Sequence, residues 1–150
     1  MFAHKGSKDR MSRKKISLWG TGDIATHHVT SLREAGFEIS NCFSRENSER
    51  SSKFAENFGI HLSESFEAFI DESRDSDGFV VALTVEVTPM MLREIAGLGK
   101  PIFVEKPGAS NSLTLINLKN EFPKSRIFVG YNRRFYAGPR KARSSRHQIA

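Results

Sequence analysis

A short apolar run that ends in a glycine turn constrains this sequence more than any other stretch. Residues 16–19 are mostly apolar, Gly20 and Gly22 follow, and Ala25 comes three positions later. Apolar residues then recur at helical spacing as far as Leu32. The pattern predicts a strand, a tight turn and a helix with the spacing G-x-G-x-x-A, which is typical of turns that bind a pyrophosphate.

Each small residue of this turn has a separate physical role. Gly20 lets the chain turn sharply, Gly22 leaves the backbone open to a pyrophosphate, and Ala25 lets the helix pack closely on the strand. The helix N-terminus then presents free N–H groups and the positive end of its dipole to the phosphates. Because glycines also occur in strand–helix turns that bind nothing, the rest of the chain has to support this interpretation.

The remainder of the chain alternates between predicted strands and helices. Residues 79–83 are apolar throughout, as a parallel strand that is buried on both faces requires. Ser63 and Thr88 are predicted to cap helices, and Met90 and Met91 to fill the core. The alternation predicts an α/β fold with a doubly wound parallel sheet, the Rossmann dinucleotide-binding fold, with its ligand at the carboxyl ends of the strands. The predicted strands are residues 16–19, 38–43, 60–62, 79–83, 102–104 and 127–130, and helices are predicted between them, one over about 47–58 and the last from Ser110 to about Glu121.

The net charge of +6 comes from the two ends of the chain. Residues 1–15 carry six Lys/Arg and one Asp, residues 131–150 carry six Lys/Arg and no acid, and the body between them has more acidic than basic residues. A basic face for nucleic acid on the fold is therefore not predicted. We expect a disordered basic arm over residues 1–14, a dinucleotide-binding domain over 15–131 and a basic lead-in to a further domain over 132–150.

Composition favours a soluble cytoplasmic protein. No apolar run approaches the ~20 residues of a membrane span, and no signal peptide is evident at the start. The single cysteine, Cys42, has no partner for an internal disulfide, which fits a reducing compartment. Cys42 is interpreted as a small buried hydrophobic residue rather than a nucleophile. The five histidines lack metal-ligand spacing, so no metal site is predicted and ordinary structural or surface roles are expected for them.

Four motifs occur in a characteristic order. They are the glycine turn, Ser44-Arg45 after the second predicted strand, Glu105-Lys106-Pro107 after the fifth, and Tyr-Asn-Arg-Arg-Phe from Tyr131 after the sixth. In this order the chain resembles the N-terminal NAD(P)-binding domain of the Gfo/Idh/MocA oxidoreductases. The resemblance implies NADP or NAD as cofactor and a reaction at the CH–OH groups of sugars, polyols or related small molecules.

The resemblance also implies a set of site residues and a cis bond between Lys106 and Pro107. Lys106 would be the catalytic residue, because a lysine can stabilise a developing alkoxide and help to move the hydroxyl proton. Without the resemblance, a solvated lysine in a Pro-Gly turn is the simpler interpretation. The implied cofactor contacts are Gly20, Thr21, Gly22, Asp23 and Ile24 at the pyrophosphate, Ser44 and Arg45 at the adenine ribose, Thr84 and Val85 at the nicotinamide, and Glu105 and Lys106 at the reacting centre.

Cofactor preference is predicted from the end of the second strand. NAD-binding domains place an acidic residue there to bind the ribose 2′-hydroxyl, whereas this chain has Ser44 and Arg45. A hydroxyl and a guanidinium suit a 2′-phosphate, so NADP is predicted to be preferred over NAD.

Two departures from the family limit the prediction. The segment from Ala82 to Met90 lacks the histidine that many members have, and the second, substrate-binding domain is missing from the sequence. We therefore expect the chain to bind cofactor without turning over substrate, and to expose a sheet edge that favours self-association or a partner chain. The alternatives are a non-catalytic dinucleotide-sensing or interaction module and, less in keeping with the charge distribution, a nucleic-acid binder with basic tails.

Overall fold

The computed structural model describes residues 13–45 and 48–131. The predicted arm and the predicted lead-in therefore lie outside the described residues, apart from residues 13 and 14. Glu46 and Asn47, which follow the Ser44-Arg45 motif, lie outside them as well.

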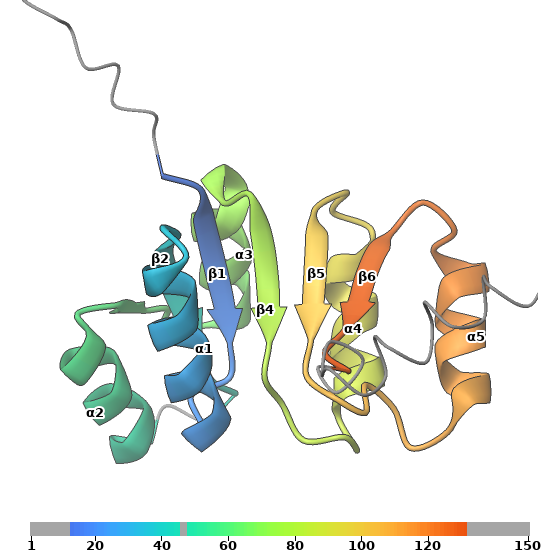
Figure 1. The fold of residues 1–150 in the computed structure, drawn as a ribbon, viewed down its shortest axis with the longest axis horizontal. Helices are drawn as coiled ribbons and strands as arrows, with labels where there is room; N and C mark the ends of the chain where they lie inside the picture. Colours follow the sequence, from blue (N-terminus) through green and yellow to red (C-terminus); the bar gives the residue numbers. More distant parts are fainter. Residues whose placement is uncertain (1–12, 46–47, 132–150) are drawn as a thin grey trace, which may run out of the picture.

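Six parallel strands form one sheet in the order β3-β2-β1-β4-β5-β6 (Figure 1). The chain starts in the middle of this sheet, builds outward through β2 and β3, and then returns to build the other half from β4. This is the doubly wound order that the alternation of strands and helices predicts, and it is confirmed. The strands are β1 (Lys15–Trp19), β2 (Glu38–Phe43), β3 (His61–Leu62), β4 (Gly78–Val81), β5 (Pro101–Val104) and β6 (Arg126–Val129).

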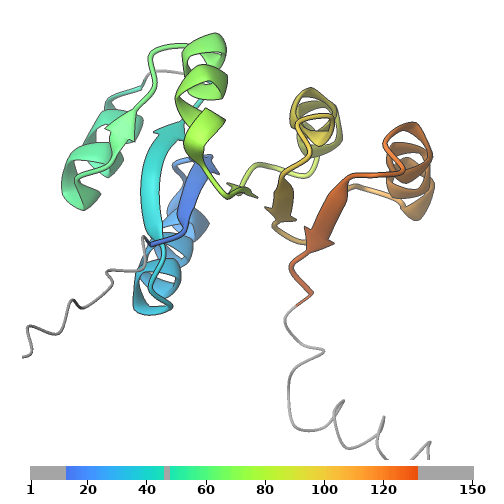
Figure 2. The same ribbon diagram turned by 90° about the horizontal axis from the view of Figure 1, so that it is seen from above.

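Helices cover both faces of the sheet and create two cores (Figure 2). On one face α1 (Asp23–Glu34) and α2 (Glu49–Phe58) pack against β1 and β2 through side chains such as Val29 and Phe54. On the other face α3 (Phe66–Glu72), α4 (Thr88–Ala96) and α5 (Ser112–Glu121) bury Phe69, Leu92 and Leu118. A short 3-10 turn, Ser73–Asp75, follows α3. No helix in the described ranges is long and apolar enough to cross a membrane.

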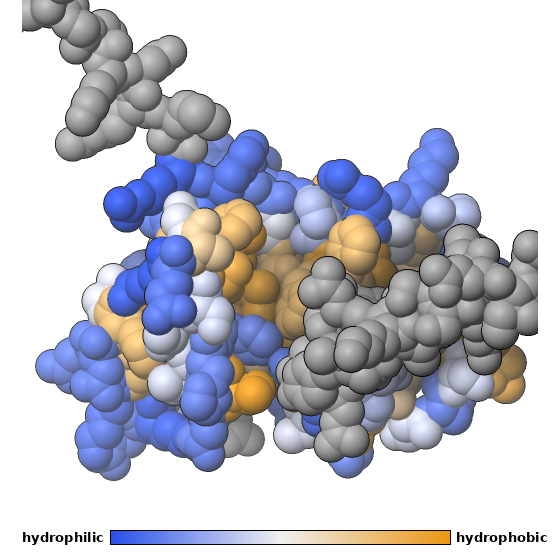
Figure 3. All heavy atoms as spheres, viewed as in Figure 1, coloured by the Kyte–Doolittle hydropathy of each residue, from blue (hydrophilic) through white to orange (hydrophobic). Residues whose placement is uncertain are grey.

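Coverage of the first face is uneven. α1 lies over β1, but no helix among the described residues covers β5 and β6 on that side (Figure 2). An apolar hollow of about 700 Å³ remains there, lined by residues that include Ile16, Phe37, Phe103 and Phe128 (Figure 3). Phe128, on the edge strand β6, is 54% exposed. Self-association through this edge stays a prediction.

The helix caps differ from those predicted. Ser63 does not cap α3, because it is buried and its hydroxyl donates to Glu72 Oε2 at 2.5 Å; Ser65 caps the helix instead and accepts the Ala68 N–H. Thr88 is the first residue of α4 rather than its cap, and its hydroxyl donates to the Thr84 carbonyl. The last helix begins at Ser112 rather than Ser110, since Asn111 provides the capping oxygen.

Buried positions agree with the prediction except at Met90 and at the end of the predicted strand 79–83, because β4 ends at Val81 and Leu83 is only half-buried. Residues 78–81 of β4 are buried at every position, as expected for a central parallel strand. Met91 packs against the core, but Met90 is 51% exposed and therefore does not fill the core. Cys42 is fully buried, and burial raises the pKa of its thiol to about 12, so it stays protonated at neutral pH and packs as a hydrophobic residue.

Candidate functional site

The glycine turn lies at the carboxyl end of β1, between the carboxyl ends of β2 and β4. The Gly20 N–H donates to the Phe43 carbonyl, and the Ala82 N–H donates to the Trp19 carbonyl. Gly20 has a φ of +113°, and a Cβ atom at this position would lie 2.3 Å from the Ala82 carbonyl oxygen. Glycine is thus required at residue 20 by the protein's own fold, because β4 passes too close for a side chain.

Gly22 is a glycine for a different reason. It is the N-cap of α1 with an extended backbone that any residue adopts, and a Cβ atom there would meet nothing within 4 Å. No side chain caps α1, whereas Ser48, Ser65 and Asn111 cap α2, α3 and α5. The turn therefore leaves open space beside a bare backbone and uncapped helix N–H groups, which is the arrangement that an anion needs.

The first two residues of α1 follow this open backbone. The Asp23 carboxylate is exposed and lies 2.7 Å from an Arg50 guanidinium nitrogen, so its negative charge is paired on the outer side of the turn. Ile24 is also exposed. Ala25 is fully buried against the sheet, as close packing of the helix requires.

A cavity of about 460 Å³ opens in front of the turn. Of the predicted contacts, the structure brings Gly20, Thr21, Gly22, Ser44, Arg45 and Thr84 together in its lining, and it leaves Asp23, Ile24, Val85, Glu105 and Lys106 outside that lining. Sequence reasoning missed the other lining residues, Trp19, Ser48, Arg50, Ser51, Ala82, Leu83, Val87 and Met91.

Hydroxyl groups connect the glycine turn to α2. The Thr21 hydroxyl donates to Ser51 Oγ at 3.2 Å, and Ser51 Oγ lies 3.1 Å from Ser48 Oγ. Ser48 also accepts the Ser51 N–H as the cap of α2. The only sequence signal for this contact is a capping serine at the start of a helix, which does not show that the helix begins beside the turn.

Two arginines line this cavity. They are Arg45 and Arg50, and no described lining residue is acidic. Ser44 lies beside them at the end of β2. The described lining therefore has no carboxylate for a ribose 2′-hydroxyl, and of its two guanidinium groups Arg50 is paired with Asp23, which leaves Arg45 as the candidate partner of an additional phosphate.

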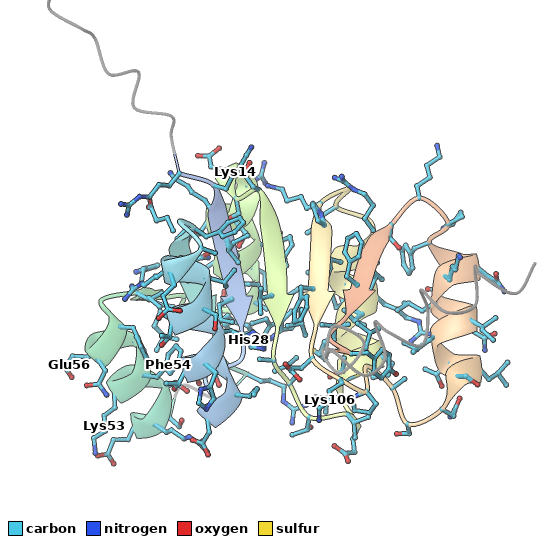
Figure 4. All side chains as sticks on the ribbon, in the orientation of Figure 1. Lys14, His28, Lys53, Phe54, Glu56 and Lys106 are labelled. Atoms are coloured by element: carbon cyan, nitrogen blue, oxygen red, sulfur yellow. The ribbon has the colours of Figure 1, made fainter. Side chains whose placement is uncertain are left out.

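The ends of β4 and β5 form the continuation of this edge. The Thr84 carbonyl accepts from the N–H and the hydroxyl of Thr88, which fixes it to α4, and Val85 follows it half-buried. Lys106 is exposed at the end of β5, and the Lys106–Pro107 bond is cis, as expected (Figure 4). β4 and β5 pair directly, so Thr84 and Lys106 lie on neighbouring strand ends.

Glu105 is held from several sides. Its N–H donates to the Val81 carbonyl, its Oε2 accepts the Lys106 N–H at 3.1 Å, and its Oε1 lies 3.0 Å from His28 Nε2 on α1. The Tyr131 hydroxyl donates to the Pro107 carbonyl on the other side of the loop. The backbone around Lys106 is thereby fixed to the sheet and to α1.

The described residues contain no cluster of three or more His, Cys, Asp or Glu side chains that could hold a metal ion. His27 is exposed, His28 lies against Glu105, and His61 lies against Glu72. His4 and His147 fall outside the described residues.

Comparison with protein-family models identifies the family of this domain. A family model described as an oxidoreductase family with an NAD-binding Rossmann fold matches residues 14–131. None of the curated proteins matches the sequence.

Solved structures resemble the chain over most of its length. They include a proposed NADPH-dependent oxidoreductase from Desulfitobacterium hafniense, with a TM-score of 0.75, 18% identity and coverage of 89% of this chain and 39% of the other. A scyllo-inositol dehydrogenase from Lactobacillus casei, with bound NAD(H) and scyllo-inositol, gives a TM-score of 0.73 and 18% identity over 91% of this chain and 41% of the other. A dehydrogenase (MviM) from Clostridium difficile gives 0.66 and 25% identity over 81% and 40%. The chain thus spans about two fifths of the length of these proteins.

Proposed function

The chain belongs to the Gfo/Idh/MocA oxidoreductases as their NAD-binding domain, and from this premise we propose that it binds NADP in preference to NAD along the carboxyl edge of its sheet. Ser44, Arg45 and α2 would hold the adenine half, and residues 20–22 would contact the pyrophosphate. Thr84, Val85 and Lys106 would hold the nicotinamide half.

The observation that carries this proposal is the open space beside Gly22. Nothing in the fold requires glycine there, since its backbone is extended and a Cβ atom would meet no neighbour. The missing side chain is explained if a phosphate approaches the backbone at this point. The peptide N–H groups of Asp23 and Ile24 at the uncapped start of α1 then bind it, while the Asp23 carboxylate stays paired with Arg50.

The preference for NADP rests on charge. Arg45 lines the cavity beside Ser44, which supplies a hydroxyl, whereas Arg50 is already paired with Asp23. A guanidinium pairs with a phosphate through two parallel hydrogen bonds, whereas it gives little extra to a 2′-hydroxyl. Arg45→Ala is expected to weaken NADP binding by about tenfold or more, which corresponds to about 1.4 kcal/mol, and to leave NAD binding nearly unchanged. Isothermal titration with both cofactors measures this, and equal losses for both would contradict the preference.

The proposed reaction is hydride transfer at a CH–OH group of a sugar, polyol or related molecule. A bound nicotinamide supplies the hydride acceptor or donor. In the oxidation direction the neutral Lys106 amine would accept the hydroxyl proton as the hydride leaves the carbon, and the resulting ammonium would release that proton to the solvent that this exposed side chain reaches. In the reverse direction the ammonium would donate a hydrogen bond to the substrate oxygen and stabilise the alkoxide charge as it develops. The neighbour from Lactobacillus casei, which was solved with scyllo-inositol, supports a polyol as the substrate class. We further propose that substrate positioning depends on residues outside these 150, and that the chain acts in the cytoplasm.

The single tryptophan provides the experiment that tests cofactor binding. Trp19 directly precedes the glycine turn and lines the cavity, and reduced nicotinamide absorbs where tryptophan emits. Titration with NADPH should therefore quench Trp19 emission and produce sensitised nicotinamide emission, with NADH as the comparison. A DNA duplex at two salt concentrations is the counter-test. Tight, strongly salt-dependent binding of the duplex together with no response to either dinucleotide would reject the proposal in favour of nucleic acid.

A further inference from the structure

A contact between α1 and the end of β5 crosses the strand that separates them. His28 Nε2 on α1 lies 3.0 Å from Glu105 Oε1, and the two side chains are only 17% and 19% exposed. The His28 ring also meets the Phe103 ring edge-on, with the ring centres 5.5 Å apart. Since β4 lies between β1 and β5, this contact joins two parts of the site that are not neighbours in the sheet (Figure 4).

The Glu105 carboxylate divides its two oxygens between different partners. Oε1 faces His28, and Oε2 accepts the backbone N–H of Lys106 at 3.1 Å. In the described part of the chain the Lys106 ammonium has no hydrogen-bond or ion-pair partner. The position of Lys106 is thus set through its backbone, and Glu105 is the side chain that holds that backbone.

The His28 and Glu105 side chains are close enough for a hydrogen bond but are not aligned for one. His28 Nε2 is buried, but its N–H is not directed at any oxygen of the described residues. At 3.0 Å, in a mostly buried setting, a polar contact between the ring nitrogen and the carboxylate is stronger than the same contact would be in water.

We propose that His28 is a positioning residue. It fixes the Glu105 carboxylate, which fixes the Lys106 peptide, and so it sets the distance between Lys106 and the glycine turn at the start of α1. This inference rests on the proposed function, in which one dinucleotide extends from that turn to Lys106. Displacements of about 1 Å at a reacting centre reduce rates strongly, so a contact across β4 that fixes the position of Lys106 would help to maintain the reaction rate.

Two variants separate this role from simple packing. His28→Phe keeps a ring against Phe103 and removes the nitrogen, whereas His28→Gln removes the ring and keeps an N–H donor with similar reach. His27→Phe, on the exposed neighbouring residue of α1, is the matched control. The measurement is amide hydrogen exchange of Lys106 in the full chain, because this exposed residue owes its protection to Glu105 Oε2.

A positioning role predicts that His28→Phe speeds Lys106 exchange by about tenfold, while His28→Gln and His27→Phe stay within about threefold of the unchanged protein. Fast exchange in His28→Gln, or unchanged exchange in His28→Phe, would overturn the proposal in favour of packing. If one variant fails to fold, the other alone decides by the same criterion.

A second readout connects the contact to the site. NADPH should protect the Lys106 amine from acylation in the unchanged protein, and His28→Phe should lose that protection while its NADPH affinity changes less than about threefold, because the phosphates are bound at Gly22. Retained protection would overturn the positioning role. If the unchanged protein does not bind NADPH, the proposed function fails, and the exchange experiment still decides whether His28 holds Glu105.

Discussion

Two glycines that stand two positions apart are glycine for opposite reasons, and this difference can be measured. Gly20 has a positive φ and no room for a Cβ atom beside Ala82, whereas Gly22 has an ordinary φ and open space. Gly20→Ala is expected to lower the free energy of unfolding by more than about 2 kcal/mol. Gly22→Ala is expected to change it by less than about 1 kcal/mol and to weaken NADPH binding about tenfold or more.

Urea unfolding and Trp19 fluorescence titration on the same two variants provide the measurements. Each glycine is the control for the other, because the same methyl group is added within one turn. A Gly22→Ala variant that binds NADPH as tightly as the unchanged protein would contradict the reading of residue 22 as the pyrophosphate position.

At the scale of elements, Glu72 connects α3 to β2 and β3. Its carboxylate accepts from Ser63 on one oxygen and lies 3.0 Å from His61 Nε2 on the other, and Asn41 of β2 reaches it at 3.4 Å. Burial by itself raises the pKa of Glu72, but the hydrogen bonds from Ser63, His61 and Asn41 and the charge of His61 outweigh it, so the pKa lies below its ordinary value.

The lowered pKa of Glu72 gives stability a definite pH dependence. A carboxyl group whose pKa is lower in the folded state stabilises the fold above its unfolded pKa, and this contribution is lost as the pH falls through the folded value. Glu72→Gln should therefore be less stable than the unchanged protein at about pH 7, and the difference should shrink toward about pH 3. Urea unfolding at both pH values measures it. Glu56→Gln, an exposed carboxylate on α2, controls for the loss of one charge, and a pH-independent difference for Glu72→Gln would contradict the prediction.

Local patterns predicted the elements well and their junctions less well. Strand β2 was predicted at its observed residues, because a run of apolar and β-forming residues between a turn and a polar segment marks both ends. The prediction for the cap of α3 is wrong because either Ser63 or Ser65 could cap the helix on sequence grounds. The Ser63 hydroxyl instead donates to Glu72, so it does not cap the helix. Helix caps depend on which partner a hydroxyl finds in space, and the sequence does not contain that information directly.

The candidate site shows the same division. The glycine turn and Glu105-Lys106 are continuous motifs, and their positions at strand ends follow from the alternation of elements. Arg50 and Ser51 line the cavity because α2 begins beside the turn. His28 contacts Glu105 across β4. These contacts join residues that are far apart in the chain. No sequence pattern around a helical histidine predicts which distant residue it will contact.

At the scale of the whole molecule, the two faces of the sheet are not equivalent. Three helices cover one face from β1 to β6, while the described helices of the other face stop at β1 and leave Phe103 and Phe128 beside an open hollow. The cavity in front of the glycine turn and this hollow share no lining residue. His28 lines the hollow and also contacts Glu105 at the end of β5, so the hollow and the carboxyl end of β5 meet at this histidine.

Binding without turnover is the prediction made for these 150 residues taken together. The turn, the start of α1 and the ends of β2 and β4 suffice to bind a dinucleotide, and a ligand that binds only the native state stabilises it. NADPH at about 100 times its Kd is expected to raise the melting temperature by on the order of 5–10 °C, and the Gly22→Ala variant is expected to show little of this shift. Turnover also needs a substrate held about 3–3.5 Å from the nicotinamide. Lys106 is exposed at the end of β5, so the described residues do not enclose a substrate beside it. With NADP and a panel of sugars and polyols, nicotinamide reduction should not exceed that of a Lys106→Ala control. Reduction that depends on Lys106 would show that these residues position a substrate by themselves or through a second chain.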